Sequence, residues 1–264
     1  MKVSKQDTHK DPTKYKKTIK VLEPIRTEPR PFNAYHHEAL SLRCSPSAFL
    51  DTIRQFTEAQ IADVKSMGFG HVLDIKVCFI TTDLGFWLLR NYDEQYNTLN
   101  IGNHRIRITR DSVYDVFGIS KGTNPVLEKK KPRKGATVEK NTTTDGVKTT
   151  IDEFRNQWPD NNKIIHALVA QAMGQQPNGN RLFKLNFLAY SNKLFVEITK
   201  STTVKQSFLL AIDKEEDISK LDWCSYVLES LKRTRQSWKR VDSQYNGPVA
   251  FLTVCFPNIF KNIK

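Results

Sequence analysis

Apolar residues recur every three or four positions in several stretches of this chain, which is the spacing of the buried face of an amphipathic helix. The second predicted helix has a capping box, Thr57 with Gln60 three residues later, and Gly68 follows its last turn as a left-handed stop. Gly118 marks the end of the fourth in the same way. Between 43 and 118 the pattern therefore predicts four helices, which begin near Ser45, at Thr57, at Thr81 or Thr82, and at Thr109.

The pattern changes from helical spacing to alternation between the third and fourth of these helices. Over 99–108, apolar and polar residues alternate on both sides of Gly102-Asn103, a pair suited to a tight reversal. This predicts a β-hairpin whose polar face presents Arg105 and Arg107, either as a phosphate-binding surface or as a solvated one. The residues over 76–80 predict a further short strand.

A second set of apolar patterns lies between 150 and 264. Residues 180–198 are apolar on nearly all sides, so they predict a helix buried at the centre of this half. The other predicted segments are a helix from a Thr150–Glu153 capping box to Trp158, a helix over 164–174, a long helix over 222–240 and a buried segment over 249–256.

These patterns predict a mainly α fold with two helical subdomains, a small β-hairpin in the first of them, and a basic disordered linker between them. The predicted divisions are a disordered basic tail over 1–40, a helical subdomain with the hairpin over 41–120, a basic flexible linker over 121–149 and a second helical subdomain over 150–264. No apolar run approaches the roughly 18 residues that a membrane-spanning helix needs, so we expect no membrane partner.

Charge separates the predicted tail and linker from the predicted helical cores. The chain has a formal net charge of +13, from 41 lysines and arginines against 28 aspartates and glutamates. The excess lies in 1–40, 119–150 and 230–264, whereas 41–118 and 151–229 are nearly neutral. This distribution favours basic arms, which contact nucleic acid or stay solvated, over a broad basic groove.

One basic run in the predicted linker has the form of a nuclear-localisation patch. It consists of Lys129, Lys130, Lys131, Arg133 and Lys134, arranged around one proline. The run therefore predicts a nuclear location, with other nuclear proteins as partners.

A second group of cations lies near the end of the long helix over 222–240. There, positive charge suits the negative end of the helix dipole, and a nucleic-acid contact is the alternative. The group consists of Lys232, Arg233, Arg235, Lys239 and Arg240. Together with Arg105 and Arg107, these residues are the candidate nucleic-acid contacts of the chain.

Residues suited to catalysis or metal binding form no recognisable constellation. Acid–base groups are present, but sequence spacing does not bring any two of them together: Asp63, Asp74, Asp83, the acidic cluster over 213–217, His71 and His104. The four cysteines contain no Cys-x-x-Cys pair and predict buried, reduced thiols, with a disulfide or zinc framework as the alternative: Cys44, Cys78, Cys224 and Cys255. The sequence therefore predicts no enzymatic activity, no cofactor and no small-molecule substrate, and an uncatalogued enzyme is the less favoured interpretation.

Several segments, in their order and spacing, resemble the plant mobile domain, also called aminotransferase-like, of transposon-derived plant proteins. The resemblance covers about 43–118 and 180–256, in Met67-Gly68-Phe69-Gly70, Phe86-Trp87-Leu88, Leu99 to Gly118, Phe183 to Leu188, Asp222-Trp223-Cys224 and Gly247-Pro248. It implies a mainly helical nuclear protein without catalysis in this domain. In longer members the domain precedes a SUMO-specific cysteine protease, whose His, Asp and Cys motifs have no counterpart in this sequence.

Two functions follow as expectations from these observations. The first is a non-enzymatic, transposon-derived nuclear protein that acts as an interaction or nucleic-acid-associated module. The second is a fragment of a mobile-element SUMO-type cysteine protease protein that lacks its catalytic domain. Cation-driven nucleic-acid binding should weaken steeply as salt is added, which separates the first from the second.

Overall fold

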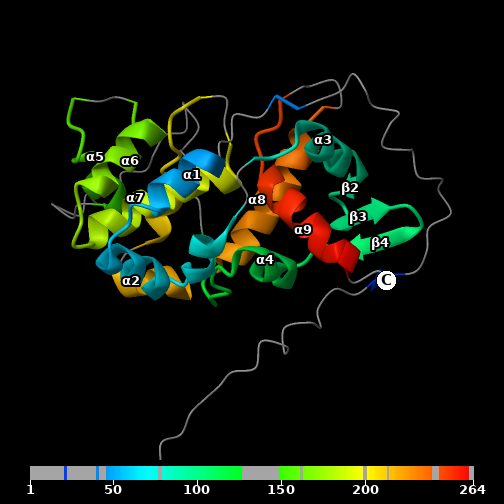
Figure 1. Cartoon of the computed structure of the whole chain (residues 1–264), viewed down its shortest axis with the longest axis horizontal. Helices are drawn as coiled ribbons and strands as arrows, with labels where there is room; N and C mark the ends of the chain where they lie inside the picture. Colours follow the sequence, from blue (N-terminus) through cyan, green and yellow to red (C-terminus); the bar gives the residue numbers. More distant parts are fainter. Residues whose placement is uncertain are drawn as a thin grey trace, which may run out of the picture.

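The computed structural model describes residues 21–22, 40–41, 46–76, 79–126, 149–160, 163–198, 201–212, 214–239 and 244–261 (Figure 1). Within these residues, no helix is both long and apolar enough to cross a membrane. Several predicted features lie outside the described residues: most of the tail over 1–40, most of the linker over 121–149, the run Lys129–Lys134, and Ser45, Cys44, Cys78, Asp213 and Arg240.

The described fold is mainly helical, as the sequence predicts, with a small antiparallel sheet. The α-helices are α1 (Pro46–Ile53), α2 (Glu58–Ser66), α3 (Thr82–Asn91), α4 (Arg110–Phe117), α5 (Thr150–Arg155), α6 (His166–Gly174), α7 (Arg181–Ser191), α8 (Trp223–Ser237) and α9 (Val249–Lys261). Short 3₁₀ segments are η3 (Gly70–Asp74), η5 (Ser207–Ala211) and η6 (Glu215–Lys220), and η4 (Asn192–Val196) is a π-helical turn that continues α7. The strands are β1 (Val21–Leu22), β2 (Tyr92–Asp93), β3 (Thr98–Ile101) and β4 (His104–Arg107), in the order β1-β4-β3-β2.

Local signals place the ends of the early helices where the sequence predicts them. The Thr57 hydroxyl accepts from the backbone N–H of Gln60, whose side chain accepts from the Thr57 N–H, and this completes the capping box of α2. At α4, Thr109 makes the same reciprocal pair with Ser112, and Gly118 ends the helix with a φ of +57°. The hairpin of β3 and β4 also forms at the predicted position, with Leu99 opposite Ile106.

The start of α5 lies one residue earlier than the predicted Thr150–Glu153 capping box. The cap is Thr149, which pairs with Asp152. Thr150 is buried, and its hydroxyl donates to the Ile212 carbonyl, so it is not available to cap the helix. Glu153 accepts instead from Arg181 at 2.8 Å. The prediction that this helix reaches Trp158 was also wrong, because it ends at Arg155.

The predicted strand over 76–80 is not observed: Lys76, Phe79 and Ile80 lie in no strand, and the two residues between them are outside the described part of the chain. The edges of the hairpin are paired with other segments. β1 lies antiparallel to β4, and β2 lies antiparallel to β3, so the sheet is completed by residues 21–22 and 92–93.

The two predicted helical subdomains share one hydrophobic core. The helices α1 and α2 lie beside α7, which belongs to the second half of the chain, and α8 and α9 lie beside α3 and α4 of the first half (Figure 1). Buried residues from both halves form one contiguous cluster. At its centre the α7 residues Phe183, Leu185 and Phe187 are fully buried, as the apolar run over 180–198 predicts.

Candidate functional site

The densest polar network joins the segment after α4 to the start of α8. Residues 121–124 lie along residues 220–222, and the Asp222 N–H donates to the Asn124 carbonyl at 2.7 Å. Gly122 passes so close to the opposing backbone that a Cβ there would lie 1.9 Å from the Lys220 carbonyl oxygen. The first residues of the predicted flexible linker therefore pair with the backbone of the second half.

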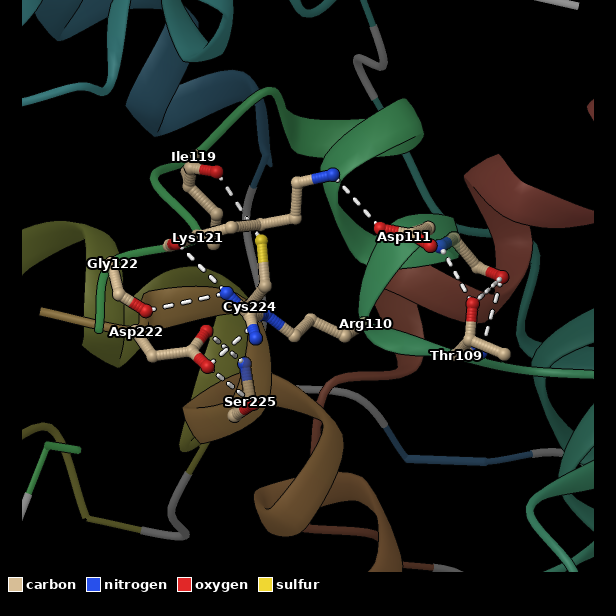
Figure 2. Close-up of polar contacts among 10 residues, drawn as sticks. Thr109, Arg110, Asp111, Ile119, Lys121, Gly122, Asp222, Cys224 and Ser225 are labelled. Carbon is tan, nitrogen blue, oxygen red and sulfur yellow. Dashed lines mark hydrogen bonds and ion pairs between the residues drawn. The ribbon is translucent and has the colours of Figure 1, made fainter. Parts of the chain in front are cut away.

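Arg110 holds this junction together from the first position of α4 (Figure 2). Its guanidinium donates to the carbonyls of Lys121 at 2.8 Å and Gly122 at 3.2 Å, and its Nε lies 3.1 Å from a carboxylate oxygen of Asp222. A cation is normally unfavourable at a helix N-terminus, so the carboxylate of Asp222 offsets the helix dipole here. Asp222 in turn caps α8 by accepting from the Ser225 N–H and hydroxyl.

Lys121 closes the other side of the same junction. Its ammonium group donates to Asp111 at 2.8 Å and lies 4.3 Å from the centroid of the Tyr114 ring. The hydrogen bond to Asp111 raises the pKa of Lys121, which keeps this cation charged. Because the charged groups of Arg110, Asp222, Lys121 and Asp111 are paired with one another, the junction works as a clasp between the halves.

Cys224 lies inside this junction, and its chemistry argues against a nucleophile. The thiol is fully buried and donates to the Ile119 carbonyl at 3.2 Å. Burial raises its pKa to about 12, and burial has the same effect on Cys255. A nucleophilic cysteine needs the opposite environment, an accessible thiol whose pKa a neighbouring cation lowers.

Alkylation of the folded chain should therefore leave Cys224 and Cys255 unmodified. A rise in pKa from about 8.5 to about 12 lowers the thiolate fraction at pH 8 by about a thousandfold. Peptide mapping after brief iodoacetamide treatment, in buffer and in denaturant, measures this protection. Rapid native labelling of Cys224, with full protection of Cys255 as the internal control, would contradict the described burial.

A groove of about 340 Å³ lies beside the clasp. The segment before the predicted basic linker forms one wall and α8 forms the other, with Thr123, Pro125, Val126, Asp222, Tyr226 and Glu229 among the lining residues. Asp222 already binds Arg110 and Ser225 there. The groove therefore offers apolar surface and one further carboxylate, Glu229, rather than a pair of acid–base groups.

The predicted acid–base residues have structural roles or stand apart. Asp63 of α2 pairs with the buried Lys184 of α7 at 3.1 Å. His71 packs directly against the backbone of Gly118, and His104 is exposed on the hairpin. Among the residues that the structure describes, no group of three or more His, Cys, Asp and Glu side chains could hold a metal ion.

The predicted cations at the end of α8 are largely bound to neighbouring groups. Arg233 pairs with the buried Glu197. Arg235 donates to the Leu89 carbonyl at 2.8 Å, lies 3.9 Å from Glu94 and covers the Trp238 ring. Lys232 is half-buried and Lys239 is exposed.

The predicted cations of the hairpin have a different setting. Arg107 is exposed, and the guanidinium of Arg105 lies over the ring of Tyr96 at 5.6 Å. The turn over 93–97 brings both basic groups to one feature, because Arg235 contacts it through Glu94 and Arg105 contacts it through Tyr96. Sequence reasoning missed this turn, although Asp93 and Asn97 are residues typical of turns.

The comparison with protein families gives one match, which spans residues 42–253 and thus includes the clasp, the hairpin and the turn. Its description is a domain of unknown function, DUF8566. The chain belongs to this family. No curated protein and no solved structure matches the DUF8566 chain.

Proposed function

We propose that this DUF8566 protein is a non-enzymatic, transposon-derived nuclear module that associates with nucleic acid through basic segments carried on a helical scaffold. The observation that carries the proposal is the pairing of β1 with β4, in which Leu22 lies opposite Arg105 and Val21 lies opposite Ile106. This pairing joins the basic N-terminal part of the sequence to the hairpin that carries Arg105 and Arg107.

Charge at this edge of the sheet comes from two distant parts of the sequence. Lys14, Lys16, Lys17 and Lys20 directly precede Val21 in the chain, and Val21 is held beside β4. Covalent connection therefore tethers this lysine run to the strand that carries Arg107. Cations gathered in this way bind phosphates and release the condensed counterions of nucleic acid, which is the main source of sequence-independent affinity.

The settings of the other cations favour the hairpin over the end of α8. Arg233 and Arg235 are engaged with Glu197, with Glu94 and with a backbone carbonyl, and breaking such contacts would offset much of the gain from binding a phosphate. Arg107 is exposed on a short strand. Phosphate contact at the hairpin therefore requires less rearrangement of the protein.

The nuclear and non-enzymatic parts of the proposal have separate support. The run Lys129–Lys134 supports nuclear import by its sequence. The buried thiols of Cys224 and Cys255, with their raised pKa values, support a role without cysteine catalysis. The transposon-derived origin rests on the resemblance to the plant mobile domain, and the alternative of a protease-protein fragment stays a prediction.

Binding of labelled duplex and single-stranded DNA across a salt series tests the nucleic-acid part of this proposal. One variant replaces five cations at the sheet edge with glutamine: Lys14, Lys16, Lys17, Lys20 and Arg107. The matched control replaces the five cations Lys129, Lys130, Lys131, Arg133 and Lys134. Because each lost phosphate contact lowers the slope of log affinity against log salt by about 0.7–0.9, we expect the sheet-edge variant to bind about 100-fold more weakly at 0.1 M salt.

The control separates the sheet edge from basic charge in general, and it should retain most of the affinity. Equal losses in both variants would place the contact on net charge rather than on the hairpin. An intact chain that binds neither form of DNA, or binds both without salt dependence, would overturn the nucleic-acid proposal and favour a protein-interaction module.

A further inference from the structure

The turn between β2 and β3 presents an aromatic ring to solvent beside the two arginines of the hairpin. The side chain of Tyr96 is 56% exposed, and among the described large hydrophobic side chains Phe79 is the other exposed one. Arg105 lies over this ring at 5.6 Å, and Arg107 is two residues further along the same strand. Residues two apart on a strand point to the same face, so both guanidinium groups belong to the face that carries Tyr96.

The turn is built to hold this ring in place. The Asp93 carboxylate accepts from the N–H groups of Gln95 at 2.9 Å and Tyr96 at 3.2 Å. The Asn97 carbonyl accepts from the Ile108 N–H at 2.7 Å, which ties the turn to the residue after β4. The backbone at Tyr96 is therefore fixed from both sides of the turn.

Asn97 adopts a left-handed backbone conformation, with a φ of +51°, and among the described residues it is the one non-glycine with positive φ. Its side-chain oxygen accepts from the Tyr92 hydroxyl at 2.9 Å. Burial raises the pKa of Tyr92, so this hydroxyl stays protonated and remains a donor. A backbone conformation that is unfavourable by itself and is held by a buried partner is a common property of functional turns.

Arg105 is positioned rather than free. Its Nε is buried without a hydrogen-bond partner among the described residues, while the guanidinium covers one face of the Tyr96 ring. The exposed surface of Tyr96 is therefore left on the opposite face and the hydroxyl edge. The result is a flat aromatic surface backed by one cation, with a second cation beside it.

We propose that Tyr96 is a stacking platform for an unpaired base, and that Arg105 and Arg107 bind the phosphates on either side of that base. This inference rests on the proposed function and makes it specific for single-stranded nucleic acid. In a duplex each base already stacks on its neighbours, so an exposed ring adds stacking energy only for a base that is unpaired. Arginines beside the ring then contact the backbone without reading the sequence.

Affinities of the full chain for a 12-nucleotide oligothymidine and for a duplex of equal length test this assignment. Tyr96→Ala should weaken binding of the single strand about 5- to 100-fold, the usual effect of one base–aromatic stack. It should change duplex affinity less than about twofold, because phosphate contacts dominate there. Tyr96→Phe, which keeps the ring and loses the hydroxyl, should restore single-strand affinity.

Phe79→Ala is the matched control, because it removes another exposed aromatic ring and should leave both affinities unchanged. A readout that depends on stacking is the fluorescence of 2-aminopurine placed in the oligonucleotide, which should be quenched by the original chain and not by Tyr96→Ala. Unfolding midpoints of the variants confirm that the fold is retained.

The outcomes separate this inference from the proposed function. Tight, salt-dependent binding that is the same for single strand and duplex, and unaffected by Tyr96→Ala, would overturn the stacking assignment and leave the proposed function standing. The absence of binding to either DNA would overturn both. Loss of duplex and single-strand affinity together in Tyr96→Ala, without rescue by Tyr96→Phe, would also contradict a stacking role.

Discussion

Gly118→Ala is expected to lower the free energy of unfolding by about 3–5 kcal/mol, the sum of overpacking and of a left-handed conformation on a residue with a Cβ. Gly118 ends α4 with a φ of +57°, and a Cβ there would lie 2.3 Å from both Cβ and Cγ of His71. These atoms are fixed to the backbone of η3, so the clash cannot be relieved by rotating a flexible side chain. Denaturant unfolding followed by circular dichroism measures the loss.

Gly102→Ala is the control for the backbone part of this effect. Gly102 also has a φ of +57°, in the turn of the hairpin, but no atom lies within 4 Å of the place where its Cβ would be. This variant should lose only about 1–2 kcal/mol, the cost of the left-handed conformation alone. Equal losses in the two variants would show that η3 does not pack against the end of α4 as described.

The ends of α2, α4 and the hairpin follow from the sequence because each is decided by residues within four positions of one another. Thr57 and Gln60 satisfy each other's backbone groups, and Gly118 adopts a conformation that a neighbouring residue would resist. No distant contact is needed for either. Such boundaries are predictable wherever tertiary contacts do not compete for the same groups.

The start of α5 shows what happens when tertiary contacts do compete. Thr149 and Thr150 are equal candidates for the cap by residue type. The choice is made by Ile212 and Arg181, which bind the Thr150 hydroxyl from 62 and 31 residues away. A sequence pattern contains no information about those partners, so the capping box was placed one residue too late.

The arrangement of the two halves was not predictable for a related reason. An apolar helix face shows that a helix is buried, but not which helix covers it. α3 of the first half packs on α9 of the second, and α2 packs on α7. The clasp of Arg110 and Asp222 left one signal in the sequence, a cation at the first position of a helix, which requires a carboxylate from elsewhere.

The candidate site was partly predictable. Alternation predicts the hairpin, and with it the exposure of Arg107 on the polar face. The neighbouring Tyr96 was missed because a tyrosine next to a strand is more often part of the core, and only the three-dimensional turn shows that its ring is exposed. The cations of α8 were selected by charge alone, whereas the structure shows Arg233 and Arg235 bound to Glu197 and Glu94.

The shared core leads to the second large effect, which is expected for Phe187→Ala. Phe187 of α7 is fully buried, and its ring lies 6.0 to 6.5 Å from four aromatic rings, those of Phe49, Phe56, Phe69 and Phe183. Three of these four come from the first half of the chain. Removing a buried phenylalanine side chain typically lowers the free energy of unfolding by about 3–5 kcal/mol.

If the halves unfold as one unit, this loss should be the same wherever it is measured. Native-state hydrogen exchange gives the local free energy of opening, and α3 and α6 report on helices from the two halves. Neither helix contains the substituted residue. Phe187→Ala should therefore lower the protection of both by the same amount, whereas Phe187→Leu, which keeps apolar volume, should cost less than about 1.5 kcal/mol.

A loss of protection confined to α6 would mean that α3 opens independently, and that the contacts of α7 with the first half contribute little to its stability. An equal loss in both helices would mean that the aromatic cluster around Phe187 couples the two halves. In that case the hairpin and its turn, which lie next to α3, are held in place by helices that follow them in the sequence by more than a hundred residues. The proposed nucleic-acid surface would then depend on the whole core, and destabilising α7 should weaken single-strand binding in proportion to the fraction of unfolded chain.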